Sequence, residues 1–108
     1  MVGTIKSSTE ISYIFSHGKR YTSTSLTILV LKDQQHGPQG RVAFIAGKKN
    51  GNAVWRNSAK RRMRAVCSEL GGPWPGYDVV FLAKRRTTEL SYSKVLNDTK
   101  KIICNFIN

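Results

Sequence analysis

The chain has few acidic residues and no long apolar segment. Only six of its 108 residues are Asp or Glu, against 18 Lys and Arg, so the formal net charge is +12. This excess exceeds what an ordinary enzyme of this size carries and indicates a polyanionic partner. No apolar run approaches the roughly 20 residues that span a bilayer. No segment joins a basic face to a wide apolar one, so we expect no membrane partner. Residues 1–6 lack the apolar region of a secretory signal.

The scarcity of cysteine, histidine and acid excludes several kinds of site. Cys67 and Cys104 are far apart in the sequence, and we expect both to be small core residues on helices, not a disulfide or metal pair. A reducing, cytoplasmic setting fits that use. The six acids are scattered, so the pattern predicts no two-metal nuclease site. Only His17 and His36 are left as a general acid and base, and no motif connects them. We therefore expect no catalytic residue and no metal ligand in this chain.

The length allows one modest hydrophobic core, so we expect a single domain over residues 1–108. Apolar periodicity, caps and turn residues predict the elements in order. They are a helix over 9–16, strands over 25–31 and 41–46, a basic helix from about 53 to 70, a central strand over 77–83 and a helix over 92–107 capped by Ser91, with an extra short strand left open. Asn52 is a candidate cap of the basic helix. This order favours an α+β, two-layer α-β sandwich.

Residues 48–64 hold seven of the 18 Lys and Arg. On the predicted helix, apolar residues share one face at helical spacing: Ala59, Met63, Val66, Cys67 and Leu70. A polar stripe runs beside that face and contains Asn57, Lys60, Arg61 and Arg64, with Arg56 near the helix start. Only Glu69 opposes these cations on the helix, and unopposed like charges cost stability. We interpret the stripe as a surface that pairs with nucleic-acid phosphates.

The pattern Lys48-Lys49-x-Gly51-Asn52-Ala53-Val54-x-Arg56-Asn57-x-x-Lys60-Arg61-x-x-Arg64 resembles the signature of the bacterial ribonuclease P protein subunit. The resemblance extends over nearly the whole chain, because the first helix, the apolar strand and the last helix occur in the same order. One departure is Ser58, which stands where the family usually has a second basic residue after Arg-Asn. One phosphate or RNA contact is therefore either missing or supplied by a neighbour such as Arg62.

The resemblance implies a fold and a function. The fold would be like domain 2 of ribosomal protein S5, with a left-handed β-α-β crossover around the basic helix, whereas most such crossovers are right-handed. The function would be that of an RNA-based endonuclease that removes the 5′ leader of precursor tRNA. A catalytic RNA would perform the hydrolysis with Mg²⁺ held mainly by RNA, and no obligate protein partner is evident. The implied RNA-binding residues are Lys48, Lys49, Asn52, Arg56, Asn57, Lys60, Arg61 and Arg64.

The resemblance also implies a cleft for the single-stranded leader, beside the first helix. Phe15 matches an aromatic position of that cleft, and Leu29, Lys19 and Arg20 would lie along it. Ile11 and Leu29 stand where the family often has aromatic residues, so less base stacking is available than usual. The alternative, that Phe15 is a core residue, stays open at this point.

Two other functions are compatible with the charge. A non-enzymatic RNA-binding or ribosomal-type protein with the same fold would explain the basic helix, although not the dense pattern of residues 48–64. A DNA-binding helix would need a helix-turn-helix partner or a dimer signal, and the sequence has neither.

Overall fold

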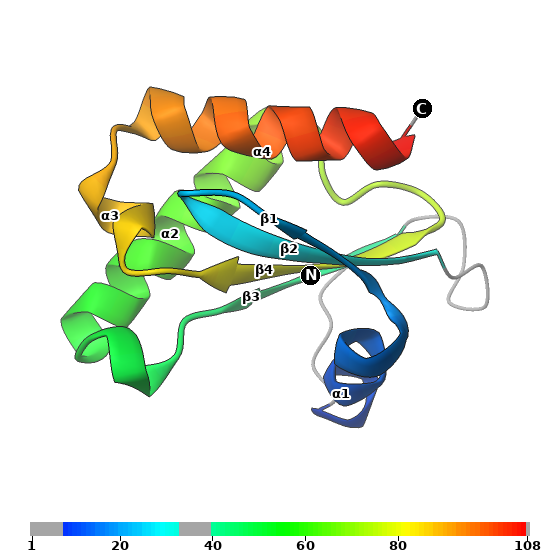
Figure 1. Cartoon of the computed structure of the whole chain (residues 1–108), viewed down its shortest axis with the longest axis horizontal. Coiled ribbons are helices and arrows are strands. Elements are labelled where there is room, and N and C mark those ends of the chain that lie inside the picture. The colour runs from blue at the N-terminus through cyan, green and yellow to red at the C-terminus, as the bar shows by residue number, and fades with distance from the viewer. Residues whose placement is uncertain (1–7, 33–39, 108) are drawn as a thin grey trace.

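The computed structural model describes residues 8–32 and 40–107 (Figure 1). Its elements are α1 (Ser8–His17), β1 (Lys19–Thr22), β2 (Leu26–Lys32), β3 (Arg41–Ile45), a 3-10 turn η1 (Lys48–Asn50), α2 (Ala53–Glu69), β4 (Tyr77–Ala83), a short α3 (Arg86–Glu89) and α4 (Tyr92–Ile107). Every predicted helix and strand is present, and β1 is the strand that was left open. The turn η1 and helix α3 were not predicted. No helix in these two ranges has the combined length and apolarity that crossing a bilayer requires.

The four strands form one mixed sheet in the order β1-β2-β4-β3. β2 pairs antiparallel with both β1 and β4, whereas β3 pairs parallel with β4. The most apolar strand, β4, therefore lies inside the sheet, as predicted. Val79, Val80 and Phe81 are all buried, which means that both faces of β4 are covered at its centre.

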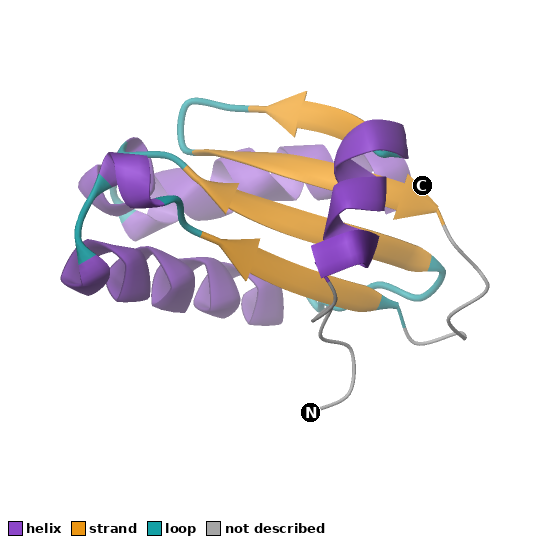
Figure 2. Cartoon of the chain, turned by 90° about the horizontal axis from the view of Figure 1, so that it is seen from below, coloured by secondary structure: helices purple, strands orange, loops and turns teal. Residues whose placement is uncertain are grey.

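Helices lie on both faces of the sheet. α2 and α4 cover one face, and α1 crosses the other (Figure 2). The α+β class is thus confirmed, and α1 adds a partial third layer to the predicted two. Along β2, alternate residues serve the two faces, because successive side chains of a strand point in opposite directions. Ile28 and Val30 join the core under α2 and α4, and Leu29 joins a separate cluster under α1.

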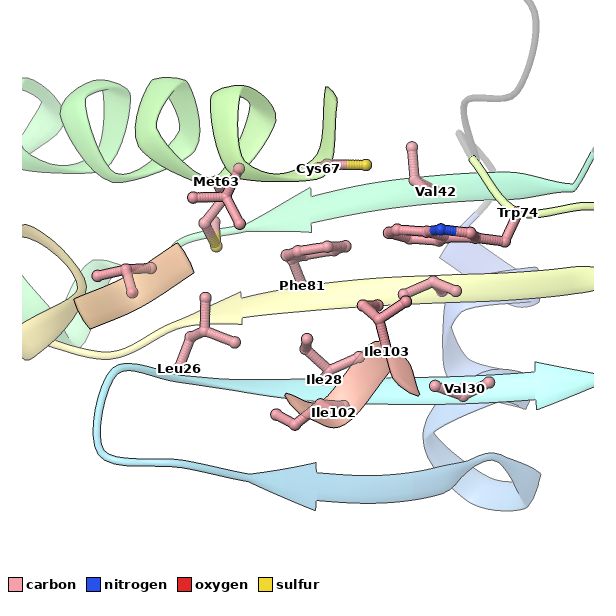
Figure 3. Packing of buried hydrophobic residues seen from close by; sticks show 13 residues of the cluster. Leu26, Ile28, Val30, Val42, Met63, Cys67, Trp74, Phe81, Ile102 and Ile103 are labelled. Atoms are coloured by element: carbon pink, nitrogen blue, oxygen red, sulfur yellow. The ribbon is translucent and has the colours of Figure 1, made fainter. Parts of the chain in front are cut away.

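The larger core forms around Phe81 of β4 (Figure 3). Met63 and Cys67 reach it from α2, and Trp74 stacks on Phe81 with 6.3 Å between ring centroids. Burial also raises the pKa of the Cys67 thiol to about 11. Cys104 was predicted to be a core residue as well, and this is wrong, since it is exposed on α4. It follows the buried Ile103 by one residue, a rotation of about 100° that turns it away from the sheet.

Both ends of α2 are fixed by local chemistry. The Asn52 side-chain oxygen accepts a hydrogen bond from the Trp55 backbone N–H at 3.0 Å, so the predicted cap is confirmed. At the other end, Gly71 has a φ of 86°, a left-handed conformation that favours glycine. The backbone N–H of Gly72 then bonds to the Cys67 carbonyl at 2.9 Å and closes the helix.

A buried polar group ties α4 to the start of β2. The Ser25 hydroxyl donates to Asp98 Oδ2 at 2.5 Å, and Lys94 Nζ donates to Asp98 Oδ1 at 3.1 Å. Burial alone would raise the pKa of Asp98, but these hydrogen bonds outweigh burial and hold the pKa below its usual value. The charged carboxylate is therefore part of the folded structure.

We predict that Asp98→Asn lowers the free energy of unfolding at pH 7 by about 1–2 kcal/mol, because charge-assisted hydrogen bonds become neutral ones. A pKa that is lowered on folding stabilises the protein above the unfolded value of about 3.9. That contribution disappears as the pH falls through the lower folded pKa. Urea unfolding at several pH values measures the difference, which should shrink in acid. Asn97→Ala, at an exposed neighbouring position, is the control, and an equal loss there would contradict the assignment.

Candidate RNA-binding surface

α2 divides its side chains between the core and the outside. Ala59, Met63, Val66 and Cys67 are buried, and Leu70, just beyond the helix, packs against the same core. The predicted apolar face is therefore confirmed. The adjoining side carries the predicted polar stripe, here called the basic row: Asn57, Lys60, Arg61 and Arg64. These four side chains line one open hollow of about 450 Å³.

The basic row lies along the β3 edge of the sheet. The Arg64 guanidinium carbon stands 5.8 Å from the centre of the Phe44 ring, which belongs to β3 and packs against the core. This contact orients the guanidinium without neutralising it. The one acid of α2, Glu69, does not join the row, because its Oε1 accepts a hydrogen bond from the Tyr92 hydroxyl at 3.0 Å. Burial and this hydrogen bond both raise the pKa of Tyr92. The row thus keeps its full positive charge for a partner.

The segment before α2 carries further predicted residues. Lys48 and Lys49 are exposed in η1, and Arg56 is half-buried in the first turns of α2. The side-chain oxygen of Asn52 already accepts the capping hydrogen bond, so its NH₂ group is the part of the side chain more available to a partner. Gly51 lies against the Trp55 ring, where a Cβ would come within 2.7 Å of the indole. A larger residue would displace Trp55, so the glycine allows the turn from η1 into α2.

Arg62, the neighbour that could replace the basic residue absent at Ser58, is used inside the fold. Its Nη1 donates to the Leu90 carbonyl and, at 3.4 Å, to the Thr87 carbonyl. These bonds hold α2 against α3 and the start of α4. This use of Nη1 favours the alternative that the contact is missing, which stays a prediction. Neighbours on one helix have different roles here, since a step of about 100° separates the outer side from the α3 side.

The α1 face of the sheet is uncovered toward the ends of β3 and β4. In Figure 2 only α1 lies over the strands, among the described residues, and it crosses near the opposite end. Arg41 forms ion pairs with Glu10 at 2.6 Å and with buried Asp78 at 2.9 Å, and these raise the pKa of Arg41. One flank of α1 is thereby fixed toward the start of β3. By helix geometry, Phe15 lies on the other flank, toward the uncovered part.

The four residues predicted to line the leader cleft do not all lie on one exposed surface. Phe15 is 39% exposed, so the alternative of a core residue is wrong. Leu29 is only 1% exposed beneath α1, which corrects the expectation that its side chain lines the cleft. Arg20 pairs in register with Leu29 and so shares its face, while Lys19 faces the other side, 5.3 Å above the Tyr21 ring. Only Phe15 and Arg20 therefore combine exposure with the right face.

Arg85 and Arg86 are two further cations to which no role could be assigned from the sequence. β3 and β4 are parallel neighbours, so Lys48 and Lys49 and the run Lys84-Arg85-Arg86 follow strands that end at the same edge. Lys84 Nζ donates to the Ser23 carbonyl at 2.6 Å and supports the β1–β2 turn. Arg85 and Arg86 are exposed. Their position at the same end of the sheet as Lys48 and Lys49 depends on the parallel pairing, which the resemblance implies through its β-α-β crossover but no local pattern reveals. Among residues 8–32 and 40–107, no group of three His, Cys, Asp or Glu is placed to hold a metal ion.

Comparisons with known proteins give one consistent result. The family model described as Ribonuclease P matches residues 3–106. The Ribonuclease P protein component of Natranaerobius thermophilus is 37% identical over 93 residues, covering 84% of this chain and 78% of that protein. The protein of the same name from Streptococcus mutans is 38% identical over 90 residues, covering 82% and 73%.

Solved structures agree with the fold. The RNase P protein of Staphylococcus aureus superposes with a TM-score of 0.82 at 18% identity, covering 97% of this chain and 95% of that chain. The RNase P protein from Thermotoga maritima gives a TM-score of 0.79 at 18% identity, covering 97% and 98%. At this identity the likeness concerns the fold, and the relatives above carry the family assignment.

Arg61 and Arg62 form a matched pair for testing the surface. We predict that Arg61→Ala changes the free energy of unfolding by less than about 0.5 kcal/mol. It should weaken the binding of structured RNA and lower the slope of log K against log salt by about one. Arg62→Ala should instead destabilise the fold by about 1–3 kcal/mol, because the Leu90 carbonyl loses its donor, and leave the slope unchanged. Chemical unfolding and salt-dependent RNA titration measure both. The opposite result, in which Arg61→Ala destabilises the fold and Arg62→Ala lowers the salt slope, would show that the two sides of α2 are wrongly assigned.

Proposed function

Because the chain belongs to the ribonuclease P protein component family, we propose that it works as the protein subunit of ribonuclease P, the ribonucleoprotein that removes the 5′ leader of precursor tRNA. The single observation that carries the structural part is the basic row on α2. The buried face of the helix fixes the row on the outside, where its four side chains line an open hollow. The catalytic RNA is the polyanion that this row would bind. Lys48, Lys49 and Arg56 extend the surface toward the start of α2.

Such a surface supplies positive charge, held in a fixed geometry, that balances the negative charge of the RNA. Each phosphate that pairs with Lys or Arg releases condensed counterions, so affinity is high and falls steeply with salt. Arg61 and Arg64 can each bind a phosphate through two N–H groups, and Asn57 can reach a sugar or base edge. Since helix α2 is packed on the sheet, these groups need little reordering on binding. The protein then stabilises the folded RNA and performs no bond cleavage itself.

The substrate leader has a separate place in this proposal. The uncovered part of the α1 face has a half-buried apolar floor formed by Ile45 and Leu82, which pair across β3 and β4. Phe15 is exposed on the flank of α1 that is directed toward this part and offers a ring for base stacking. Lys49, at the end of β3, can neutralise leader phosphates. Holding the leader there orients the scissile phosphate on the RNA, an effect of positioning.

We assign the Mg²⁺ of the reaction to the RNA subunit and the substrate, whose phosphate oxygens are hard ligands that suit this ion. We also infer that the β3–α2–β4 connection is a left-handed crossover of the ribosomal protein S5 domain 2 type. The parallel pairing of β3 with β4 requires a crossover through α2, which lies on the face opposite α1 (Figure 2), and the left hand is what the family resemblance implies. Residues 1–108 are treated as one domain that acts in the cytoplasm, where tRNA precursors are processed in bacteria.

The test is reconstitution. We predict that the chain, added to a bacterial ribonuclease P RNA at low Mg²⁺, increases the rate of precursor tRNA cleavage and gives a mature 5′-phosphate end. The physical reason is that protein cations reduce the Mg²⁺ needed to offset phosphate repulsion. Gel analysis of end-labelled precursor measures it, with the chain alone and the RNA alone as controls.

Absence of stimulation would refute the proposed function. Preferential recovery of ribosomal RNA over ribonuclease P RNA in a pull-down would instead support a non-enzymatic ribosomal-type protein. Cleavage by the chain after removal of all RNA would contradict the assignment of the chemistry to the RNA.

A second prediction concerns the leader. Phe15→Ala should weaken the affinity of the reconstituted enzyme for precursor tRNA with a long leader by about 1–3 kcal/mol, the usual value of one base stacked on an aromatic ring. It should not change affinity for a precursor with a single leader nucleotide. Tyr13→Ala is the matched control, because Tyr13 is 53% exposed on the same helix but lies on the flank away from Phe15. Equal losses in both variants would remove Phe15 from the leader site.

A further inference from the structure

Val54 is the most exposed large apolar side chain among the described residues, with 76% of its surface accessible. It lies in the first turn of α2, one residue past the helix start. At about 100° per residue it lies opposite Met63, so it occupies the outermost line of the helix. A β-branched residue also lowers helix propensity slightly. Nothing inside the fold therefore accounts for a valine at this position.

The surroundings of Val54 are those of an interface. Asn57 and Arg61, one and two turns further along α2, share its side and line the hollow of the basic row. Lys48 and Lys49 are exposed just before the helix. On the same outer line, Ser58 and Ala65 are exposed and short. The row cations thus lie on one side of these short groups, and Arg61 lies on the line between Ser58 and Ala65, so that the patch formed by Val54 and Ser58 can approach a partner closely while the cations reach past it.

RNA offers a surface that matches this arrangement. An A-form RNA helix has a wide, shallow minor groove that exposes ribose carbons and 2′-hydroxyls between two rows of phosphates. The row cations beside Val54 would pair with phosphates, while the methyl groups of Val54 would contact sugar or base carbons. Such a contact adds affinity through burial of apolar surface and is independent of salt.

We propose that Val54 packs directly against the catalytic RNA, and that with Ser58 it forms a close-contact patch beside the basic row. This inference rests on the proposed function, because it takes the RNA subunit as the partner. It goes further by naming a non-electrostatic contact within a surface otherwise defined by charge. Val54 is a positioning residue in this scheme, since it fixes how closely and in which register α2 lies on the RNA.

Substitutions at Val54 separate contact from charge. Val54→Ala should weaken binding to a bacterial ribonuclease P RNA about three- to tenfold, with the same salt slope as the wild type. Val54→Lys should weaken binding too, although it adds a positive charge, because a hydrated ammonium replaces the apolar contact. Val54→Thr keeps the β-branched shape and should fall between the wild type and Val54→Ala. All three should melt like the wild type, because the side chain contributes no core packing. Filter binding across a salt series provides the affinities and slopes.

A charge added elsewhere is the control. Asn97→Lys places the same group on the exposed side of α4, so it reports what one more charge does to affinity by itself. Tighter binding and a steeper slope for Val54→Lys would overturn the inference, since Val54 would then merely face solvent within an electrostatic surface. Unchanged affinity of Val54→Ala would overturn it as well. Failure of the wild-type chain to bind the RNA is a different result and would count against the proposed function itself.

Discussion

The packing of one side of α2 onto the sheet is the constraint on which the rest of the surface depends. Ala59, Met63, Val66 and Cys67 are buried over the sheet, so the rotation of the helix about its axis is fixed. Once that rotation is set, the positions of Lys60, Arg61 and Arg64 follow from the helical repeat. A surface that binds a folded polyanion by geometry needs this rigidity, because flexible cations would lose much of their attraction to the entropy of ordering.

Contacts at the ends and flanks of α2 hold the helix in this orientation, although its like charges repel one another. Asn52 caps the start, and Arg62 joins the helix to α3 through backbone carbonyls. Glu69 is directed to Tyr92 and away from the basic row. The free protein therefore carries a row of like charges that the one acid of α2 does not offset. A bound polyanion would relieve that repulsion, so binding and folding stability should rise together by linkage.

Much of this could be read from the sequence, and most of the exceptions depend on contacts between residues that lie far apart in the chain. Helix α2, its cap at Asn52 and the central strand β4 depend on local spacing and were predicted within a residue or two. The burial of Leu29 depends on where α1 crosses the sheet, and the use of Arg62 depends on a carbonyl of Leu90, which lies 28 positions away. Cys104 was misplaced although the repeat of α4 already turned it outward, which is an error of interpretation. Phe15 could be settled only once the Glu10–Arg41 ion pair oriented α1.

The parallel pairing of β3 with β4 places the two proposed binding surfaces at the same end of the sheet. Because both strands end at one edge, the exposed residues Lys49 and Arg85 lie at the same end of the sheet, where α2 begins and the α1 face is uncovered (Figure 2). An antiparallel pair would have placed these cations at opposite ends. One end of a small sheet can thereby serve two surfaces at once, the outer side of α2 and the face that Phe15 borders. In the proposed function, these surfaces bind the catalytic RNA and the substrate leader. The distance between the two RNAs is then set by the thickness of the sheet and one helix, which a folded core keeps constant.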